Sequence, residues 1–152
     1  MFEIREPSSK QDMDDMYELR KRVMAAPNAG KTAERDEMDG TYKVLSVIAV
    51  SKEAEAERVV GTARLHRNND EEGQIKFMCI DEGFRNLGLS SKMLEYLHAR
   101  AKKMGLSRVV ANVVESEKKF YLTQGYEVKE KLRSRSGDVV SIKMGKPLAG
   151  VR

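Results

Sequence analysis

Residues 74–94 most constrain the fold, because an apolar strand pattern there runs through a short polar turn directly into a helix pattern. Residues 74–80 suit a buried strand, the turn at residues 81–86 is small and polar, and Gly88 stands where the helix begins. The first N–H groups of a helix lack carbonyl partners and carry partial positive charge. A glycine there lets an anion approach the backbone closely, and Arg85 adds a guanidinium group. The segment therefore predicts a cradle for a pyrophosphate.

The turn differs from two common phosphate-binding motifs. Its spacing is not that of the long P-loop, and it lacks the three-glycine pattern of dinucleotide-binding folds. Taken alone, Arg85-x-x-Gly88-x-Ser90 also fits a strand-to-helix turn in which the glycine serves geometry only. The functional interpretation therefore depends on the rest of the chain.

A second motif, Phe120-Tyr121-Leu122-Thr123-Gln124-Gly125-Tyr126, follows at a suitable distance. Together the two segments resemble the GNAT N-acetyltransferase superfamily. Its acetyl-coenzyme A loop has the pattern Gln/Arg-x-x-Gly-x-Gly/Ala, and its second signature is Phe/Leu-Tyr followed shortly by Gly-Phe/Tyr. Ser90 departs from the usual glycine or alanine but is also small. The resemblance spans nearly the whole chain, because the order of strands and helices matches as well.

The predicted elements alternate along the chain. Apolar and β-branched runs predict strands at 2–5, 42–50, 59–66, 74–80, 107–114, 126–132 and 139–144. Helical spacing predicts helices at 8–24, 88–104 and 115–124, the first opened by a capping box Ser8-x-x-Gln11, with a short helix or loop at 31–38. The pattern predicts one domain over residues 1–152 in the α/β class. We expect a three-layer α/β/α sandwich with the GNAT fold: a mixed, mostly antiparallel sheet with a central, splayed parallel pair, 74–80 and 107–114.

The resemblance implies acetyl-coenzyme A as co-substrate, with no metal. The pantetheine arm would pair with the backbone of Met78 and Ile80, and one of these N–H groups could stabilise an oxyanion. The pyrophosphate would meet the N–H groups of residues 86–90. The cofactor-binding residues expected in this way are Met78, Cys79, Ile80, Arg85, Asn86, Leu87, Gly88, Leu89, Ser90, Ser91, Asn112 and Tyr121.

Acyl transfer to an amine needs proton transfers, because only about 0.1% of an alkyl amine is neutral at pH 7. The resemblance assigns Tyr121 as the general acid that protonates the leaving thiolate, although a core aromatic residue fits the same position. Relatives often carry a glutamate as base where this chain has Lys76. Candidates for a catalytic base are Glu72, His66 and Asp81, of which we select Glu72, and bulk water is the remaining alternative.

An acidic segment follows the predicted first helix. The stretch from Tyr17 to Asp39 resembles a GNAT subgroup that opens with Leu-Arg-x-x-Val-Leu-x-x-Pro-x-Gly and continues with Asp-Glu-x-Asp. Two interpretations fit the acids: they attract a cationic amine, or they form a solvated loop. The residues concerned are Glu34, Asp36, Glu37 and Asp39.

Composition excludes several classes. A net charge of +4 is too small for a nucleic-acid signature, and the basic residues are interleaved with acids except in the C-terminal third. No apolar run approaches a membrane span, and no secretory signal is expected at the start. The single cysteine, Cys79, lies among apolar residues, which favours buried packing over a nucleophile and suits a reducing cytoplasm.

The sequence predicts an N-acetyltransferase that moves an acetyl group to a primary amine of a small molecule, peptide or protein. A non-catalytic acyl-coenzyme A sensor is the alternative, because the strand glutamate is missing. An RNA-associated module using the basic C-terminal third is a third class, which no aromatic-rich basic motif supports. We therefore expect no nucleic-acid or membrane partner, and a homodimer is left open.

Overall fold

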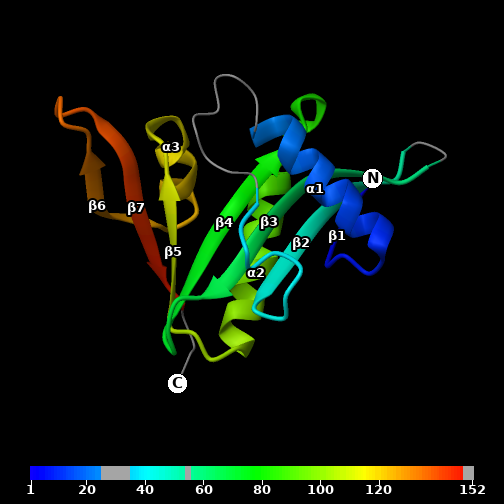
Figure 1. Ribbon diagram of the computed structural model, residues 1–152, viewed down its shortest axis with the longest axis horizontal. Helices are drawn as coiled ribbons and strands as arrows, with labels where there is room; N and C mark the ends of the chain where they lie inside the picture. The colour runs from blue at the N-terminus through cyan, green and yellow to red at the C-terminus, as the bar shows by residue number, and fades with distance from the viewer. Residues whose placement is uncertain (25–34, 54–55, 149–152) are drawn as a thin grey trace. The chain divides into compact units, whose positions relative to one another are not determined.

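The computed structural model describes residues 1–24, 35–53 and 56–148 (Figure 1). Its elements are, in chain order, β1 (Phe2–Arg5), α1 (Lys10–Met24), β2 (Val44–Ser51), β3 (Arg58–Arg67), β4 (Glu72–Ile80), η1 (Glu82–Phe84), α2 (Leu89–Lys103), β5 (Arg108–Val113), α3 (Glu115–Thr123), β6 (Glu127–Arg133) and β7 (Val139–Pro147). The expected strands and long helices are present within a few residues of their predicted bounds. The short 3₁₀ turn η1 was not expected.

The strands form one seven-stranded sheet in the order β1-β2-β3-β4-β5-β7-β6. Antiparallel pairing joins β1 to β2, β2 to β3, β5 to β7 and β6 to β7, whereas β4 and β5 are parallel. The parallel register runs from Glu72 opposite Arg108 to Ile75 opposite Ala111. The prediction of a mixed, mostly antiparallel sheet with a central parallel pair is confirmed.

The chain forms two compact units. The first is Met1–His66 with Phe77–Leu97, and the second is Arg67–Lys76 with His98–Arg152. The boundary therefore falls inside β4, between Lys76 and Phe77. The expectation of a single domain over residues 1–152 stays a prediction.

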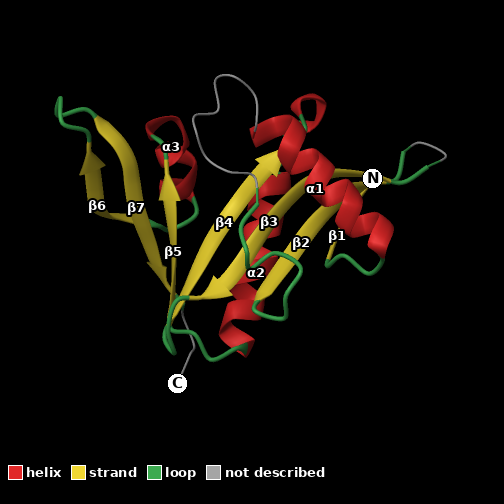
Figure 2. Cartoon of the chain, in the orientation of Figure 1, coloured by secondary structure: helices red, strands yellow, loops and turns green. Residues whose placement is uncertain are grey.

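In the first unit, α1 lies on one face of the strands and the first turns of α2 lie on the other (Figures 1 and 2). Successive strand residues point to opposite faces. Accordingly Cys79 belongs to the core beneath α1, whereas Ile80 approaches Gly61 and Met93 on the α2 side. The buried residues of the core beneath α1 are Met16, Leu19, Ile48, Val50, Val59 and Cys79.

Gly61 lies close to side chains on the α2 side of the sheet. A Cβ added there would lie 2.8 Å from Ile80 Cδ1 and 3.2 Å from Met93 Cε. Both atoms are the ends of flexible side chains, which can shift to make room. The contact places the end of β4 and the start of α2 side by side at Gly61.

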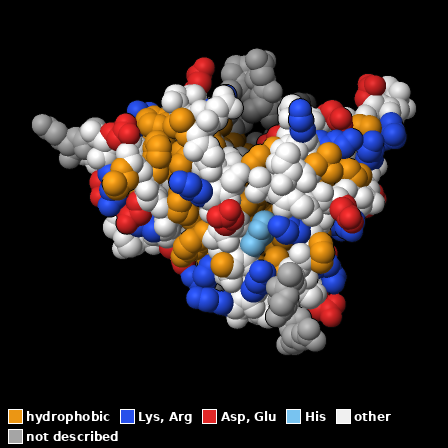
Figure 3. Space-filling view, turned by 180° about the vertical axis from the view of Figure 1, so that it is seen from behind, with side chains coloured by type: hydrophobic (Ala, Val, Ile, Leu, Met, Phe, Trp, Pro, Cys, Tyr) orange, Lys and Arg blue, Asp and Glu red, His pale blue; other side chains and the backbone are white. Residues whose placement is uncertain are grey.

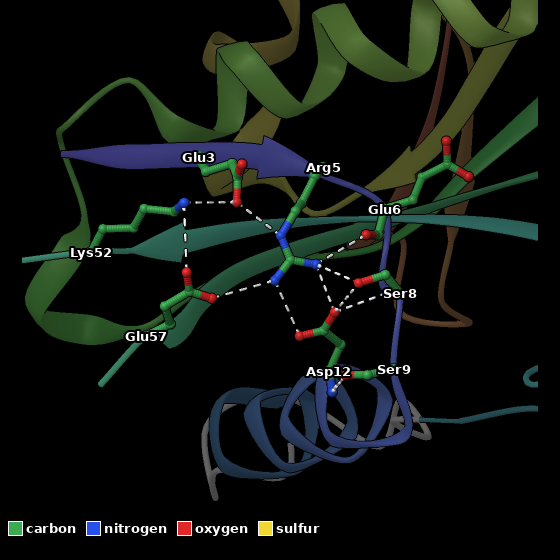
Figure 4. A network of polar contacts seen from close by, with 8 residues as sticks. All are labelled: Glu3, Arg5, Glu6, Ser8, Ser9, Asp12, Lys52 and Glu57. Carbon is green, nitrogen blue, oxygen red and sulfur yellow. Dashed lines mark hydrogen bonds and ion pairs between the residues drawn. The ribbon is translucent and has the colours of Figure 1, made fainter. Parts of the chain in front are cut away.

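The start of α1 is tied to β1 by an ion network around Arg5 (Figure 4). Arg5 binds both carboxylate oxygens of Asp12, at 2.6 and 3.2 Å, and this contact lowers the pKa of Asp12 to about 2. Ser9 Oγ accepts a hydrogen bond from the Asp12 N–H at 3.0 Å. The helix is therefore capped by Ser9, and the expected capping box at Ser8 is wrong by one residue because Ser8 binds the Asp12 carboxylate instead.

In the second unit, α3 packs against β7. Tyr121 and Tyr126 are buried there, as are Ile142 and Met144 of β7. Strand β6 is largely exposed, with charged side chains along most of its length. Apolar residues of these elements are also exposed, namely Leu122 of α3, Leu132 of β6 and Val140 of β7.

Some predicted features lie outside the described residues, namely the helix break at 27–30 and the first half of the segment 31–38. Residues 35–38 contain no helix. Acidic and basic side chains lie among one another on the face shown in Figure 3, as their interleaving along the sequence predicts. No helix in the described part of the chain is long and apolar enough to cross a membrane.

Candidate active site

The turn between β4 and α2 has an unusual backbone. Asn86 and Gly88 both have left-handed conformations, with φ of 64° and 76°. Asparagine and glycine are the residues that adopt this region most readily. The side chains of residues 85–88 are exposed, so the turn presents Arg85 and its own backbone to the surface. Left-handed residues in a short turn can direct neighbouring N–H groups toward one side, where an anion binds.

The turn leads directly into the first turn of α2. The first helical hydrogen bond is donated by Lys92 N to Gly88 O at 3.2 Å. The N–H groups of Leu89 and Ser90 thus precede the helical series and lie at the positive end of the helix. Leu89 is buried and anchors the helix start, while Ser90 and Ser91 are partly exposed. This arrangement suits a phosphate group.

The three β4 residues among the expected cofactor-binding residues have different environments. Cys79 is buried beneath α1, Ile80 packs near Gly61 and Met93, and Met78 is partly exposed. Burial raises the pKa of the Cys79 thiol to about 12. The thiol is therefore inert packing, as its sequence context predicted, and only its backbone can serve a ligand.

Cys79 should resist thiol reagents in the folded chain. A shift of the thiol pKa from 9.0 to about 12 lowers the thiolate fraction near pH 8 by roughly 10³-fold, and burial adds a steric barrier. Alkylation followed by mass spectrometry should show a slow native reaction and a fast reaction in denaturant. Equal rates in the two states would contradict this placement.

Tyr121 lies on α3, in the second unit. Its side chain is 3% exposed, and its ring packs edge-on against Phe120 and Tyr126, with centroids 5.3 and 5.1 Å away. Burial, and secondarily the charge of Glu117, raises the pKa of the Tyr121 hydroxyl. The hydroxyl therefore stays protonated at neutral pH and can only donate a proton. Asn112 lies on β5 with its side chain exposed, opposite Lys143 of β7.

A contact between His98 and Tyr126 lies next to Tyr121. His98 Nε2 lies 2.7 Å from the Tyr126 hydroxyl, and Tyr126 in turn packs on the Tyr121 ring. Burial, followed by the charges of Lys146 and Lys102, lowers the pKa of His98 to about 4, so the imidazole is neutral. His98 is therefore a buried packing residue. The pairing was not predicted, because nothing local links residues 28 positions apart.

Glu72, the selected base, lies at the start of β4, eight residues before Ile80. It accepts hydrogen bonds from Asn68 Nδ2 at 2.8 Å and Arg108 Nε at 3.1 Å. These contacts, that of Asn68 foremost, lower the pKa of Glu72. The carboxylate is therefore a weaker base than an ordinary glutamate.

The other two base candidates are also engaged. His66 Nδ1 lies 3.2 Å from Arg64 Nη2, and since a guanidinium group only donates, Nδ1 must accept. Neutral His66 then carries its proton on Nε2. That nitrogen has no free lone pair and cannot act as a base. Asp81 pairs with Arg22 at 2.9 Å and Arg58 at 2.6 Å, so its charge is compensated by two cations.

The acidic segment forms a buried ion cluster. Arg20 and Arg64 share Asp39 Oδ1, at 2.9 and 3.0 Å, and Arg64 also binds both oxygens of Asp36, at 2.7 and 2.8 Å. The Arg20 and Arg64 side chains are fully buried, and that of Asp39 is 1% exposed. Two arginines balance two aspartates, so both expectations, a solvated loop and an attractant for amines, are wrong for this pair. Glu37 is exposed, and Glu34 lies outside the described residues.

Comparisons with known proteins agree with this geometry. An acetyltransferase (GNAT) family model matches residues 13–126. The fold is similar to a GNAT-family acetyltransferase from Staphylococcus aureus MU50, with 18% identity, coverage of 97% of this chain and 99% of the other, and a TM-score of 0.78. It is also similar to the ribosomal-protein-S18-alanine N-acetyltransferase of Escherichia coli (18% identity, 97% and 94% coverage, TM-score 0.72). A third similar structure is an aminoglycoside 6'-N-acetyltransferase complexed with coenzyme A (14% identity, 96% and 97% coverage, TM-score 0.76). The chain therefore belongs to the GNAT acetyltransferase family, whose members transfer acyl groups from coenzyme A to amines.

Proposed function

We propose that this chain transfers an acetyl group from acetyl-coenzyme A to a primary amine. The observation that carries the proposal is the turn at residues 85–90, exposed at residues 85–88, which places two left-handed residues and a cation at the positive end of a helix. The pyrophosphate of coenzyme A is a dianion of suitable size for such a cradle. Arg85 supplies charge, and the N–H groups from Asn86 to Ser90 supply hydrogen bonds.

The pantetheine arm would lie along the end of β4. We assign its backbone partners as Met78 and Ile80, because an extended chain can pair with strand N–H and C=O groups as an added strand does. The N–H of one of these residues would face the thioester oxygen and stabilise the charge that develops as the amine attacks. The amine nitrogen forms a bond to the acetyl carbon, and the carbon–sulfur bond breaks to release the coenzyme A thiolate.

Tyr121 is our candidate for the group that assists this thiolate. Its raised pKa keeps the hydroxyl protonated, so it can donate a hydrogen bond as negative charge gathers on sulfur. Glu72, His66 and Asp81 are each engaged by an arginine, so we favour water as the acceptor of the ammonium proton. Asn112 on β5 stays a candidate contact for the arm.

The acceptor is best sought among amines of contrasting size. One structurally similar protein acts on the alanine of a ribosomal protein, and another acts on aminoglycosides. A panel should therefore contain an alanine-starting peptide, a lysine-containing peptide, a polyamine and an aminoglycoside.

Release of coenzyme A that depends on one of these amines would establish catalysis. Tight binding of acetyl-coenzyme A with no turnover would favour a sensor, and absence of binding would overturn the cofactor assignment. A thermal-shift preference for NAD over acetyl-coenzyme A would also contradict it.

Replacing Gly88 with valine should weaken acetyl-coenzyme A binding about tenfold or more. Nothing lies within 4 Å of a Cβ added at Gly88, so the new side chain would project into the space that the phosphate needs, and the left-handed backbone would be strained. Isothermal titration calorimetry measures the change.

Gly105→Val is a matched control, because Gly105 at the other end of α2 is also left-handed, with φ of 81°, and also faces open space. It should lose similar thermal stability but keep its affinity. Equal affinity in both variants would contradict the cradle.

A further inference from the structure

A strained residue interrupts β4. Phe77 has φ of 55°, a left-handed value inside a strand. For a bulky residue without glycine's freedom this conformation is an outlier, and it persists only where the surroundings hold it. Phe77 follows the stretch where β4 pairs with β5 and precedes Met78, to which the proposed function gives a ligand-facing backbone. A change of direction at Phe77 therefore decides where the next N–H groups point.

Two buried arginines contact the Phe77 ring. The Arg20 guanidinium carbon lies 4.4 Å from the ring centroid and that of Arg64 lies 4.8 Å from it. Within the described part of the chain, Arg20 Nε and Nη2 and Arg64 Nε are buried without hydrogen-bond partners. The electron-rich ring face compensates cations whose N–H groups are not all paired. The ring therefore lowers the free-energy cost of burying these two charges.

The same arginines are fixed by carboxylates from elsewhere in the chain. Arg20 comes from α1 and Arg64 from β3, and both meet at Asp39 Oδ1. The Asp39 carboxylate also accepts the Asp36 N–H at 3.0 Å, which ties the acidic segment to itself. Arg20 and Arg64 therefore contact the Phe77 ring, and the acidic segment contacts these two arginines.

We propose that the ion cluster of Arg20, Asp36, Asp39 and Arg64 is a positioning device for the acyl-transfer site. Its two arginines contact the ring of Phe77 and stabilise the left-handed conformation inside β4. This conformation sets the direction of the backbone at Met78–Ile80. The proposal rests on the proposed function for the role of that backbone. The cluster itself touches neither the cofactor nor the amine, so its members are positioning residues.

Two variants test the cluster without removing its charges. Phe77→Leu keeps an apolar side chain but loses the ring face, and Arg20→Lys keeps the cation beside Asp39 but loses the planar group over the ring. The backbone at residue 77 is read by the NMR scalar coupling between its amide and α protons, which depends on φ. Both variants should shift this coupling toward the extended-strand value and should weaken acetyl-coenzyme A binding about tenfold.

Phe2→Leu is the matched control, because it makes the same change from phenylalanine to leucine in the first unit, at a partly buried residue of the edge strand β1. It should lower the melting temperature as well but leave the coupling at residue 77 and the affinity as they are. If Arg20→Lys fails to fold, Phe77→Leu decides, since it leaves all four charges in place. Native coupling, or native affinity despite a changed coupling, would overturn the proposal. If the unmodified chain does not bind acetyl-coenzyme A, the proposed function fails, and the coupling still shows whether the cluster holds Phe77.

Discussion

Replacing Tyr121 with phenylalanine should lower turnover of acetyl-coenzyme A by about 10²- to 10³-fold and leave its affinity nearly unchanged. The substitution keeps the ring that packs on Phe120 and Tyr126 and removes only the hydroxyl. If that hydroxyl faces the thioester sulfur, it interacts little with the neutral thioester and strongly with the departing thiolate. Its loss therefore raises the barrier without weakening the ground-state complex.

The raised pKa of Tyr121 defines how the hydroxyl acts. A thiol has a pKa near 8.5, well below that of the buried hydroxyl, so complete proton transfer to the thiolate is uphill. The hydroxyl then contributes mainly as a hydrogen-bond donor, and turnover should show no basic limb from its ionisation up to about pH 10. Steady-state kinetics across this range with the best amine of the panel checks both the magnitude and the pH profile.

Tyr126→Phe is the matched control for this experiment. It also removes one buried tyrosine hydroxyl from the same aromatic group, but that hydroxyl binds His98. We expect lower stability and near-native turnover. Near-native turnover in Tyr121→Phe itself would make Tyr121 a structural residue and leave protonation to water or another group.

The order of elements and the turn at residues 85–90 were predictable because both depend on local sequence. Runs of β-branched residues such as those of β2 and β5 indicate strands directly, and the helical spacing of apolar residues indicates α2. Gly88 marks a backbone that other residues adopt at a cost, so its position indicated the turn before its geometry was known. The pairing of β4 with β5 followed from the strand–helix–strand order.

The ion cluster and the strained Phe77 could not be predicted in the same way. Asp36 and Arg64 are 28 residues apart, and a run of acids in a polar segment carries no mark of burial. Phenylalanine inside an apolar run predicts an ordinary strand residue, and nothing in the neighbouring sequence marks its left-handed backbone. The state of the base candidates could not be predicted from the sequence either. The contacts of Glu72, His66 and Asp81 with arginines form only in the tertiary fold.

Replacing Asp39 with asparagine should destabilise the chain by about 3–5 kcal/mol at neutral pH. The substitution leaves the shape of the side chain almost unchanged, but among the residues that the structure describes it leaves the two buried guanidinium groups with Asp36 as their one carboxylate partner. Breaking a buried pair by removing one charge costs this much because the other charge stays uncompensated away from water. Denaturant unfolding followed by circular dichroism measures the change as a shift in midpoint.

Asp14→Asn offers a control, and the pH dependence offers a second check. Asp14 pairs with Lys10 at 2.8 Å on the exposed face of α1, so its loss should cost less than about 1 kcal/mol.

Burial opposes ionisation of Asp39, but Arg20, the Asp36 N–H and Arg64 outweigh it and lower the pKa of Asp39. A carboxylate with a lowered folded-state pKa stabilises the fold above its unfolded pKa of about 3.9, and this stabilisation is lost as the pH falls toward the folded value. The difference in stability between the unmodified chain and Asp39→Asn should therefore be full at pH 7 and should shrink below about pH 4. A difference under 1 kcal/mol at pH 7, matching that of Asp14→Asn, would show that the four charges do not act as a buried cluster.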